Sequence, residues 1–310
     1  MPQSSASEYL RHGQTPFFRL PAVGWPVDPV DAMVIGVPHD GGTTYQPGAR
    51  FAPYHVRRTS ALVQSYHPGH RVDVFSRVNA VDAGNVVFPP FSRPAMRDAV
   101  FEMIADVAAA RAVPFVVGGD HSITAPILRA MAAAHGPVAV LHVDAHLDTS
   151  GPETWGDDHH HGTPIRHALA ERWIAPGALA SIGIRGPWGA DDDAALVRRH
   201  DALIASPDDV ANRGVPKLVA ELRERFADKP LYVTIDVDGL DPAFAPGTGT
   251  PVPGGLTTRE LLAIVRGLAG ANIVGMDVVE IAPALDHADL TCHLGAHLLF
   301  EGLALLAVRT

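Results

Sequence analysis

Short apolar runs rich in Val and Ile alternate along this chain with longer segments that have helical spacing. Parallel strands that are buried on both faces need such runs, and the connections between them are usually helices. The expected strands cover residues 32–37, 78–81, 114–117, 138–143, 179–184, 231–235 and 272–279, and the expected helices cover residues 94–112, 124–135, 163–173, 216–227, 257–270 and 289–307. The pattern predicts an α/β fold of three layers, in which helices cover both faces of a mostly parallel central sheet.

Nothing in the sequence divides the chain into two globular units. Residues 31–310 contain no flexible linker, change in composition or repeat of fixed period, so we expect one domain there. Residues 1–30 are polar and contain several prolines. We expect them to form an N-terminal extension that packs on the domain or on a neighbouring subunit.

The charge balance and the cysteine content limit the expected partners and compartment. Lys and Arg number 24 against 34 Asp and Glu, which gives a formal net charge of −10. Nucleic acids and anionic membranes attract basic surfaces, so neither is an expected partner. Cys292 is the single cysteine, the N-terminus lacks the pattern of a signal peptide, and no apolar run is apparent that reaches the ~18 residues of a membrane span. A cytoplasmic protein is therefore expected.

Three segments place potential metal ligands at the ends of predicted strands: GGDHS, HVDAHLD and TIDVDGLDP. In the last two, the ligands recur at every second position. Alternate side chains of an extended backbone share one face, so this spacing directs the ligands of each segment the same way. The six candidate ligands are His121, Asp144, His146, Asp148, Asp236 and Asp238.

Four carboxylates and two imidazoles exceed the usual coordination of one ion and would repel one another if no cation were bound. Two divalent cations resolve both difficulties. Oxygen ligands with a minority of nitrogen and no thiolate favour Mn²⁺ or a similar ion. Two ions ~3.5 to 4 Å apart can share a water, lower its pKa and present hydroxide as a nucleophile. The ligands therefore predict metal-assisted hydrolysis.

The three segments resemble the signature regions of the ureohydrolases, the arginase and agmatinase superfamily, and the third region extends as TIDVDGLDPAFAPGTGTPVPGG. Further matches are PGARFAP at residues 47–53, HGTP at 161–164, SIGIRG at 181–186 and MDVVEIAPALD at 276–286. The resemblance spans most of the chain. It implies an arginase-like fold, a hydrolase with two Mn²⁺ per chain, and a homo-oligomer, either a trimer or a hexamer.

The resemblance also implies roles for individual residues. In the family's pattern one ion is held by His121, Asp144, Asp148 and Asp236, and the other by His146, Asp144, Asp236 and Asp238. Glu280 would bind the substrate guanidinium, because a carboxylate can accept two N–H groups of this planar cation and hold its carbon at the bridging hydroxide. Asp148 would carry a proton to the departing amine. His161 would relay protons to solvent, since imidazole titrates nearest to neutrality.

Agmatine, hydrolysed to putrescine and urea in polyamine metabolism, is the expected substrate because GTGTPVPGGL and HGTP resemble the agmatinase forms. Residues 149–160, TSGPETWGDDHH, replace the segment with which arginases grip an α-amino acid carboxylate. Asp157 and Asp158 in this loop could attract the distal ammonium of agmatine. The same loop could instead suit 4-guanidinobutyrate or 3-guanidinopropionate. Formiminoglutamate hydrolysis and a catalytically silent metal-binding subunit are more distant alternatives.

Other polar residues near these motifs have structural explanations. We expect Asp241 to fix a turn, and Arg185 to tie loops at a subunit contact rather than to line the site. His159 and His160 are expected on a solvated loop rather than in a metal site.

Two positions depart from the family's pattern. Ala52 stands where a glycine is common, and Phe244 replaces a residue that is often small, Tyr or Cys. Phe244 belongs to a loop next to the predicted metal site. It therefore bears on the shape of the substrate rather than on the chemistry.

Overall fold

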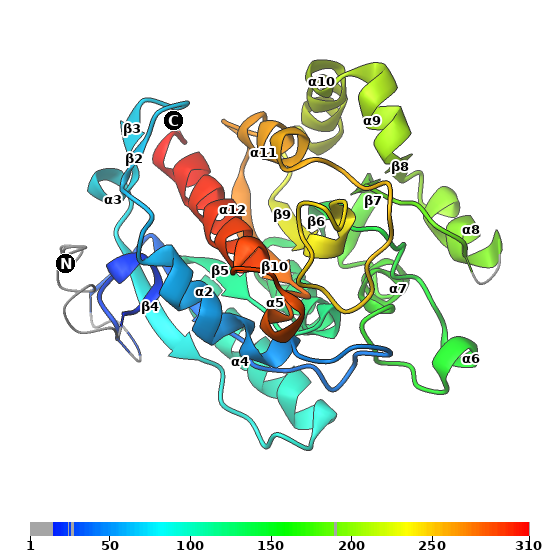
Figure 1. Cartoon of the computed structure of the whole chain (residues 1–310), viewed down its shortest axis with the longest axis horizontal. Helices are drawn as coiled ribbons and strands as arrows, with labels where there is room; N and C mark the ends of the chain where they lie inside the picture. The colour runs from blue at the N-terminus through cyan, green and yellow to red at the C-terminus, as the bar shows by residue number, and fades with distance from the viewer. Residues whose placement is uncertain (1–14, 24, 26–27, 189–190, 310) are drawn as a thin grey trace.

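The computed structural model describes residues 15–23, 25, 28–188 and 191–309 (Figure 1). Within these residues, eight strands form one sheet in the order β4-β1-β5-β10-β9-β6-β7-β8, and all neighbours in it are parallel. The strands are β1 Ala32–Gly36, β4 Ala80–Asn85, β5 Val113–Val117, β6 Val138–Val143, β7 Ile174–Ile182, β8 Leu203–Ala205, β9 Leu231–Asp236 and β10 Ile273–Val279. The seven predicted strands and the parallel sheet are confirmed.

Six helices lie where the sequence predicts them: α4 Arg93–Ala109, α5 Thr124–His135, α7 Pro164–Ala170, α10 Val215–Phe226, α11 Thr258–Arg266 and α12 Leu290–Ala307. Five further helices among the described residues were not predicted: α2 Ala52–Ser60, α3 Val74–Arg77, α6 Pro152–Trp155, α8 Asp191–Arg199 and α9 Pro207–Arg213. Single-turn 3-10 segments are η1 Phe17–Arg19, η2 Ala49–Phe51, η3 His121–Ile123, η4 Val237–Gly239 and η5 Pro283–Leu285, and a hairpin pairs β2 Tyr66–His67 with β3 Val72–Asp73. The hairpin strands, the 3-10 segments and helices α3 and α6 span only two to four residues each, which is too short for a periodic pattern.

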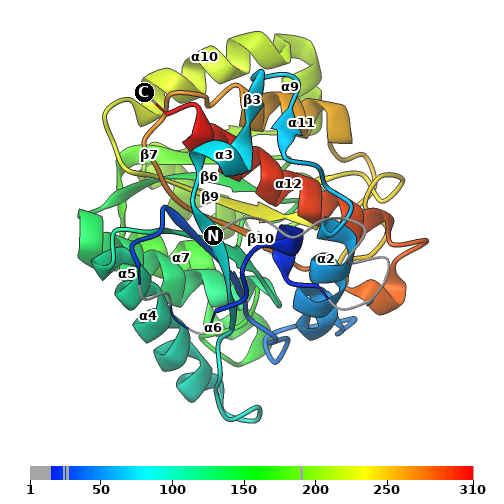
Figure 2. The same ribbon diagram turned by 90° about the vertical axis from the view of Figure 1, so that its left-hand side faces the viewer.

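The predicted three layers are present. Helices α2, α10, α11 and α12 cover one face of the sheet, while α4, α5 and α7 cover the other, as the two views show (Figures 1 and 2). Alternate residues of β1 serve the two faces: Ala32 and Val34 belong to the core beneath α12, and Met33 and Ile35 to the core beneath α4 and α5. Both faces of the strands are apolar because both are buried.

Helix α12 is long and apolar enough to span a membrane by length and composition, contrary to the sequence expectation, but 72% of it is buried inside the domain. It packs on β10, α2 and α11 and supplies much of one core. Two histidines and Glu301 interrupt its apolar sequence. Among the described residues, α12 is thus a buried core helix.

The N-terminal extension can be followed only in part, because residues 1–14 lie outside the described residues. Phe17 and Phe18 are fully buried in the core beneath α12. The Phe17 amide donates to Asp82 Oδ2 at 2.9 Å, and the Phe18 amide donates to Ser60 Oγ at 2.9 Å. This part therefore packs on the domain, while the boundary at residue 30 stays a prediction.

Candidate metal centre

The predicted ligands converge where four neighbouring strands end. β5, β10, β9 and β6 are adjacent in the sheet and parallel, so their carboxyl ends lie along one edge, where open α/β sheets bind ligands. His121 comes shortly after β5, Glu280 follows β10, Asp236 ends β9 and Asp144 follows β6. The fold thus brings together residues that are far apart in the sequence.

The backbone at this edge has unusual conformations. Asp148 and Glu280 have φ angles of 53° and 63°, in the left-handed region that residues other than glycine rarely adopt. Such a conformation costs about 1–3 kcal/mol and persists where the surroundings hold it, often at functional sites. Gly119 lies against the carbonyl oxygen of His39, which any Cβ at this position would strike. The left-handed backbone at Asp148 and Glu280 orients these two side chains, and Gly119 permits the close approach of the neighbouring chain segment.

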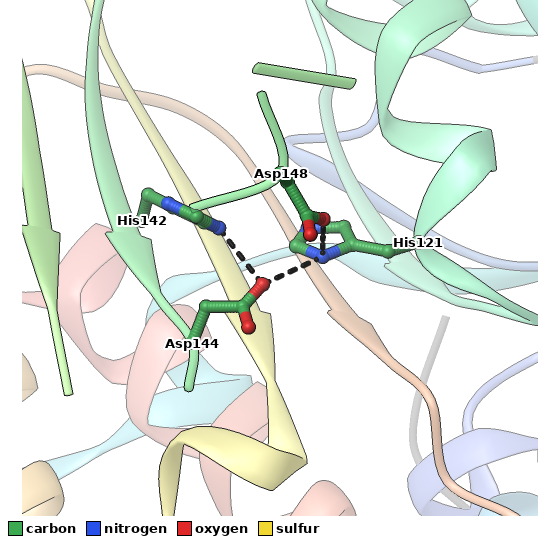
Figure 3. Close-up of side chains that lie close together, drawn as sticks. All are labelled: His121, His142, Asp144 and Asp148. Atoms are coloured by element: carbon green, nitrogen blue, oxygen red, sulfur yellow. Dashed lines mark hydrogen bonds and ion pairs between the residues drawn. The ribbon is translucent and has the colours of Figure 1, made fainter. Parts of the chain in front are cut away.

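One cluster of ligand atoms surrounds His121. Its Nδ1 lies 2.8 Å from Asp148 Oδ2, 3.0 Å from Asp144 Oδ2 and 3.4 Å from Asp236 Oδ2. Figure 3 shows the imidazole directed at the carboxylates of Asp144 and Asp148. Despite these short distances, His121 Nδ1 and Asp148 Oδ2 are buried without a hydrogen-bond partner of normal geometry among the described residues. One nitrogen and three carboxylate oxygens around one point fit a divalent cation.

A second cluster adjoins the first through Asp144. His146 Nδ1 lies 3.3 Å from Asp144 Oδ1 and 3.2 Å from Asp238 Oδ2. Asp144 therefore faces His121 with one oxygen and His146 with the other, which is the geometry of a bridging carboxylate. Asp236 Oδ1 accepts a hydrogen bond from the Asp238 amide at 2.8 Å, which orients the Asp236 side chain.

The hydrogen bonds behind His121 fix which of its nitrogens is free to bind a cation. Thr234 donates its hydroxyl to Asp277 Oδ1 at 2.6 Å, so its oxygen is left to accept from His121 Nε2 at 2.9 Å. Tyr232 and Thr124 donate to the other oxygen of Asp277 at 2.8 Å and 2.9 Å. With the proton on Nε2, the lone pair of Nδ1 points into the carboxylate cluster. Such partners commonly hold metal-binding histidines in the required tautomer.

The pKa shifts reflect a strong excess of buried negative charge. Burial and the neighbouring carboxylates raise the pKa of Asp148 and raise that of Asp236 well above its usual range. Burial also opposes ionisation of Asp144, but hydrogen bonds from three histidines outweigh it and hold its pKa well below normal. Burial disfavours charged imidazoles, yet the carboxylates raise the pKa of His121 well above normal and that of His146 to about 12. The cluster demands positive charge, which two divalent cations would supply.

His161 lies beside this centre and is held from both sides. Its Nδ1 is 3.0 Å from Glu280 Oε1, and its Nε2 is 2.8 Å from Thr44 Oγ1 and 3.3 Å from the Thr44 amide, which can only donate. In the neutral imidazole Nε2 is therefore the acceptor, and Nδ1 carries the proton that is donated to Glu280. Burial opposes protonation of His161, but the charge of Glu280 raises its pKa to about 9. The pair can hold and exchange a proton close to the carboxylate cluster.

A cavity of about 300 Å³ opens onto the centre. Its lining combines the candidate ligands with hydroxyl and aromatic side chains of the loops that follow β6 and β7. It comprises Thr44, His146, Leu147, Asp148, Thr149, Ser150, Thr154, Trp155, His160, His161, Gly162, Pro187, Trp188, Asp236 and Thr250. Glu280 is 1% exposed and lies outside this lining; its Oε1 also accepts from the His121 amide at 2.8 Å.

Two expectations for the loop of residues 149–160 need correction. Asp157 is paired with Arg93 at 2.5 Å, and neither it nor Asp158 lines the cavity, so neither is placed to attract a bound ammonium. His160 is not solvated: it is 3% exposed, and its Nδ1 accepts from the Gly162 amide at 3.1 Å. Arg93 reaches this loop from α4, a contact that no sequence pattern predicts.

The turn at Asp241 and the loop contacts of Arg185 are confirmed, while a subunit contact of Arg185 stays a prediction. Asp241 accepts from the amides of Ala243 and Gly254 at 2.9 Å and 2.7 Å and so fixes the turn. Arg185 donates to loop carbonyls, among them those of Asp238 at 2.8 Å and Gly239 at 3.1 Å. It ties the loop after β7 to the segment that carries Asp238.

The two departures from the family's pattern lie away from the cavity. Ala52 is buried at the first position of α2, and Phe244 is 40% exposed on the turn that Asp241 fixes. Neither belongs to the lining of the cavity. Among the described residues, Phe244 therefore makes no contact with the cavity through which it would affect the shape of the substrate.

Sequence reasoning missed four residues that support the site: Thr44, His142, Thr234 and Asp277. His142 Nε2 lies 2.9 Å from Asp144 Oδ2 (Figure 3). Its Nδ1 lies 3.1 Å from Ser181 Oγ. A signal was present for Asp277 and His142, because each is a polar residue inside an otherwise apolar predicted strand. Such a residue must have a buried partner.

The fold and the site define an α/β protein with a candidate binuclear metal centre. The arginase family matches residues 30–304, and the chain belongs to this family. Proclavaminate amidinohydrolase of Streptomyces clavuligerus is 42% identical to this chain over 296 residues, which cover 94% of each protein. Mitochondrial agmatinase of Gallus gallus is 40% identical, and the alignment covers 95% of this chain and 86% of that protein.

Guanidinopropionase of Pseudomonas aeruginosa is also 40% identical, with 97% of this chain and 95% of that protein covered. A solved structure of the Streptomyces clavuligerus amidino hydrolase superposes with a TM-score of 0.90 at 40% identity, covering 97% of this chain and 99% of that one. These relatives act, by their names, on different guanidino compounds. The chain is thus a hydrolase that acts on guanidino groups.

Proposed function

We propose that this chain hydrolyses the guanidino C–N bond of a small guanidino compound at a centre of two Mn²⁺ ions. The observation that carries the proposal is the pair of clusters joined by Asp144, in which His121 and His146 each direct Nδ1 at carboxylate oxygens. The hydrogen-bond chain to Asp277 supports it, since it leaves the lone pair of His121 Nδ1 for a cation.

The proposed ligands follow the two clusters. One ion would be held by His121, Asp144, Asp148 and Asp236, and the other by His146, Asp144, Asp236 and Asp238. The oxygen-rich donor set without thiolate suits Mn²⁺. When bound, the two ions would lower the pKa of a shared water and so supply the nucleophile.

The remaining steps belong to side chains of this chain. Glu280 Oε1 accepts from His161 Nδ1 and from the His121 amide, while no hydrogen bond reaches Oε2 from the described residues. We assign Oε2 to the guanidinium N–H groups, which would orient the carbon towards the centre. Asp148 would hold the proton that the departing amine needs. His161 would exchange protons with the cavity. One C–N bond is replaced by one C–O bond, and water is consumed as urea and a primary ammonium form.

Agmatine is the substrate that we propose first. No Lys or Arg is among the described residues that line the cavity, so the carboxylate of a guanidino acid would lack a cationic partner there. The net charge of −10 also favours a cationic substrate. The named relatives include agmatinases as well as enzymes of guanidinobutyrate and guanidinopropionate, which are the alternatives.

A parallel substrate assay tests the proposal. The protein is loaded with Mn²⁺ and offered agmatine, 4-guanidinobutyrate, 3-guanidinopropionate, arginine and N-formimino-L-glutamate, with urea, formamide and amine measured as products. Urea formation is expected, fastest from agmatine. Formamide alone would indicate the formiminoglutamate reaction, and no product from any compound would indicate a catalytically silent subunit. Asp236→Asn is the negative control.

We infer a cytoplasmic homo-oligomer, a trimer or hexamer, from the family resemblance and from the composition of the chain. The names of some relatives place them in mitochondria. Light scattering of the purified protein tests the assembly, and fractionation of the source cells tests the compartment.

A further inference from the structure

Two tryptophans border the cavity above the candidate metal centre. Trp155 ends helix α6, Trp188 lies in the loop after β7, and both belong to the lining that also contains His161, Asp148 and Asp236. Their exposed fractions are 62% and 42%. Large aromatic surface left open to solvent at a cavity marks a binding surface, because burial by a ligand would be favourable.

The charges around these tryptophans restrict the ligand. Among the described lining residues the carboxylates are Asp148 and Asp236, which belong to the candidate metal centre, and no Lys or Arg is present. Ser150 and Thr154 add hydroxyl oxygens to the lining. A group bound here would therefore meet aromatic faces and hydroxyls, within a protein of net charge −10.

We infer that Trp155 and Trp188 form a subsite for the cationic end of the substrate, an alkylammonium group. The inference rests on the proposed function, since it assumes that the guanidinium occupies the metal centre. An ammonium is attracted to the face of an indole ring. It also donates three hydrogen bonds and accepts none, so Ser150 Oγ and Thr154 Oγ1 can serve as acceptors.

This subsite replaces the ion pair that Asp157 and Asp158 would have provided. Asp157 is occupied by Arg93, and neither aspartate lines the cavity. Recognition by aromatic faces is less demanding in geometry than a salt bridge. The subsite would therefore accept ammonium groups at the ends of chains of somewhat different length, while it would disfavour a terminal carboxylate.

The test compares three substrates of similar length that differ in the charge of the distal end: agmatine, n-pentylguanidine, in which a methyl replaces the ammonium, and 4-guanidinobutyrate. Their kcat/KM values are measured with Mn²⁺-loaded wild-type protein and with Trp155→Leu, Trp155→Phe, Trp188→Leu and Trp188→Phe. Trp25→Leu is the matched control, because Trp25 is 45% exposed and does not line the cavity. Metal content and circular dichroism establish that each variant is folded and loaded.

The wild-type protein is expected to prefer agmatine to n-pentylguanidine about 3- to 30-fold. Each leucine variant should reduce this ratio, chiefly through a higher KM for agmatine, and each phenylalanine variant should keep most of it. Trp25→Leu should leave the ratio unchanged. A separate readout is the quenching of tryptophan fluorescence by 1,4-diaminobutane, which the leucine variants should weaken and Trp25→Leu should not.

Several results would overturn the inference while leaving the proposed function intact. These are an unchanged agmatine to n-pentylguanidine ratio in both leucine variants, an equal loss for all three substrates, or a wild-type preference for 4-guanidinobutyrate that depends on the tryptophans. If the wild-type protein hydrolyses none of the guanidino compounds, the proposed function itself fails.

Discussion

Replacement of Thr234 by valine removes one hydroxyl from behind His121 and nearly preserves the volume of the side chain. Thr234 is fully buried, accepts from His121 Nε2 at 2.9 Å and donates to Asp277 Oδ1 at 2.6 Å. In the variant the Nε2 proton has no acceptor there. A neutral His121 would then favour the tautomer with its proton on Nδ1, which lies 2.8 Å from Asp148 Oδ2 and 3.0 Å from Asp144 Oδ2.

The size of the effect follows from this change of tautomer. A cation at the cluster needs the Nδ1 lone pair, so Mn²⁺ binding to the variant must restore a buried N–H without an acceptor. Leaving such a group unpaired costs about 1–3 kcal/mol. Loss of a partner behind a metal ligand typically weakens metal binding about 10- to 100-fold, which is about 1.4–2.7 kcal/mol. The two values agree, and we expect Thr234→Val to weaken Mn²⁺ binding by this factor.

The Mn²⁺ dissociation constant is measured by equilibrium dialysis, with free Mn²⁺ followed by its electron paramagnetic resonance signal. Thr234→Ser should bind Mn²⁺ nearly as wild type, because it keeps the hydroxyl. Thr59→Val is the matched control: Thr59 is buried, and its hydroxyl bonds to the carbonyls of Val56 and Cys292, neither of which is a candidate ligand. Equal Mn²⁺ affinity of Thr234→Val and wild type, or equal loss in the serine and valine variants, would refute the reasoning.

Three further predictions concern neighbouring residues. Asp236→Asn should abolish activity and lower Mn²⁺ retention more than about tenfold. Asp241→Asn alters only a turn and should change activity and retention less than about twofold. Metal analysis after dialysis compares the two variants, and similar losses would contradict the assignment of Asp236 as a ligand. Thr44→Val should lower kcat about tenfold and shift the pH profile of kcat, because His161 Nε2 loses its hydroxyl partner at 2.8 Å. Thr44→Ser keeps the hydroxyl and should retain the wild-type kcat and profile. An unchanged profile in Thr44→Val would argue against proton exchange by His161. In the metal-free protein, folding raises the pKa of His161 from 6.5 to about 9. At 1.36 kcal/mol per unit, the protonated imidazole stabilises the fold by about 3 kcal/mol below pH 6.5, and this stabilisation is lost as the pH rises through 9. Urea unfolding below pH 6.5 and above pH 9 should show the loss in wild type and not in His161→Asn.

Much of the fold could be predicted from the sequence because its long elements have clear periodic patterns. Strands β6 and β9 and helix α12 are long, apolar and bounded by polar or glycine-containing segments, and they lie where the pattern places them. Strand β8, Leu203–Ala205, is too short to show a pattern and exists because it pairs with the edge of β7. Helix α12 is also apolar over 18 residues, and only its burial in the fold shows that it is a core helix.

The sequence by itself determined the chemical types at the site. The alternate spacing of Asp144, His146 and Asp148, and of Asp236 and Asp238, predicts a shared face only for extended backbone. In the structure Asp148 has a φ of 53° and Asp238 lies in η4, so their approach depends on the local backbone after each strand. Parallel strands end at one edge, so the convergence of the two groups also followed from the predicted fold class. The family resemblance added His161 and Glu280, which the structure places in contact at 3.0 Å.

Only the tertiary structure decided which partners surround these residues. It showed that Thr234 and Asp277 set the tautomer of His121, that Arg93 occupies Asp157, and that Trp155 and Trp188 border the cavity. The physical reason is that periodicity fixes the face on which a side chain lies, whereas hydrogen bonds and ion pairs depend on distances of a few tenths of an ångström between segments far apart in the chain. Those distances are set by the packing of the whole domain.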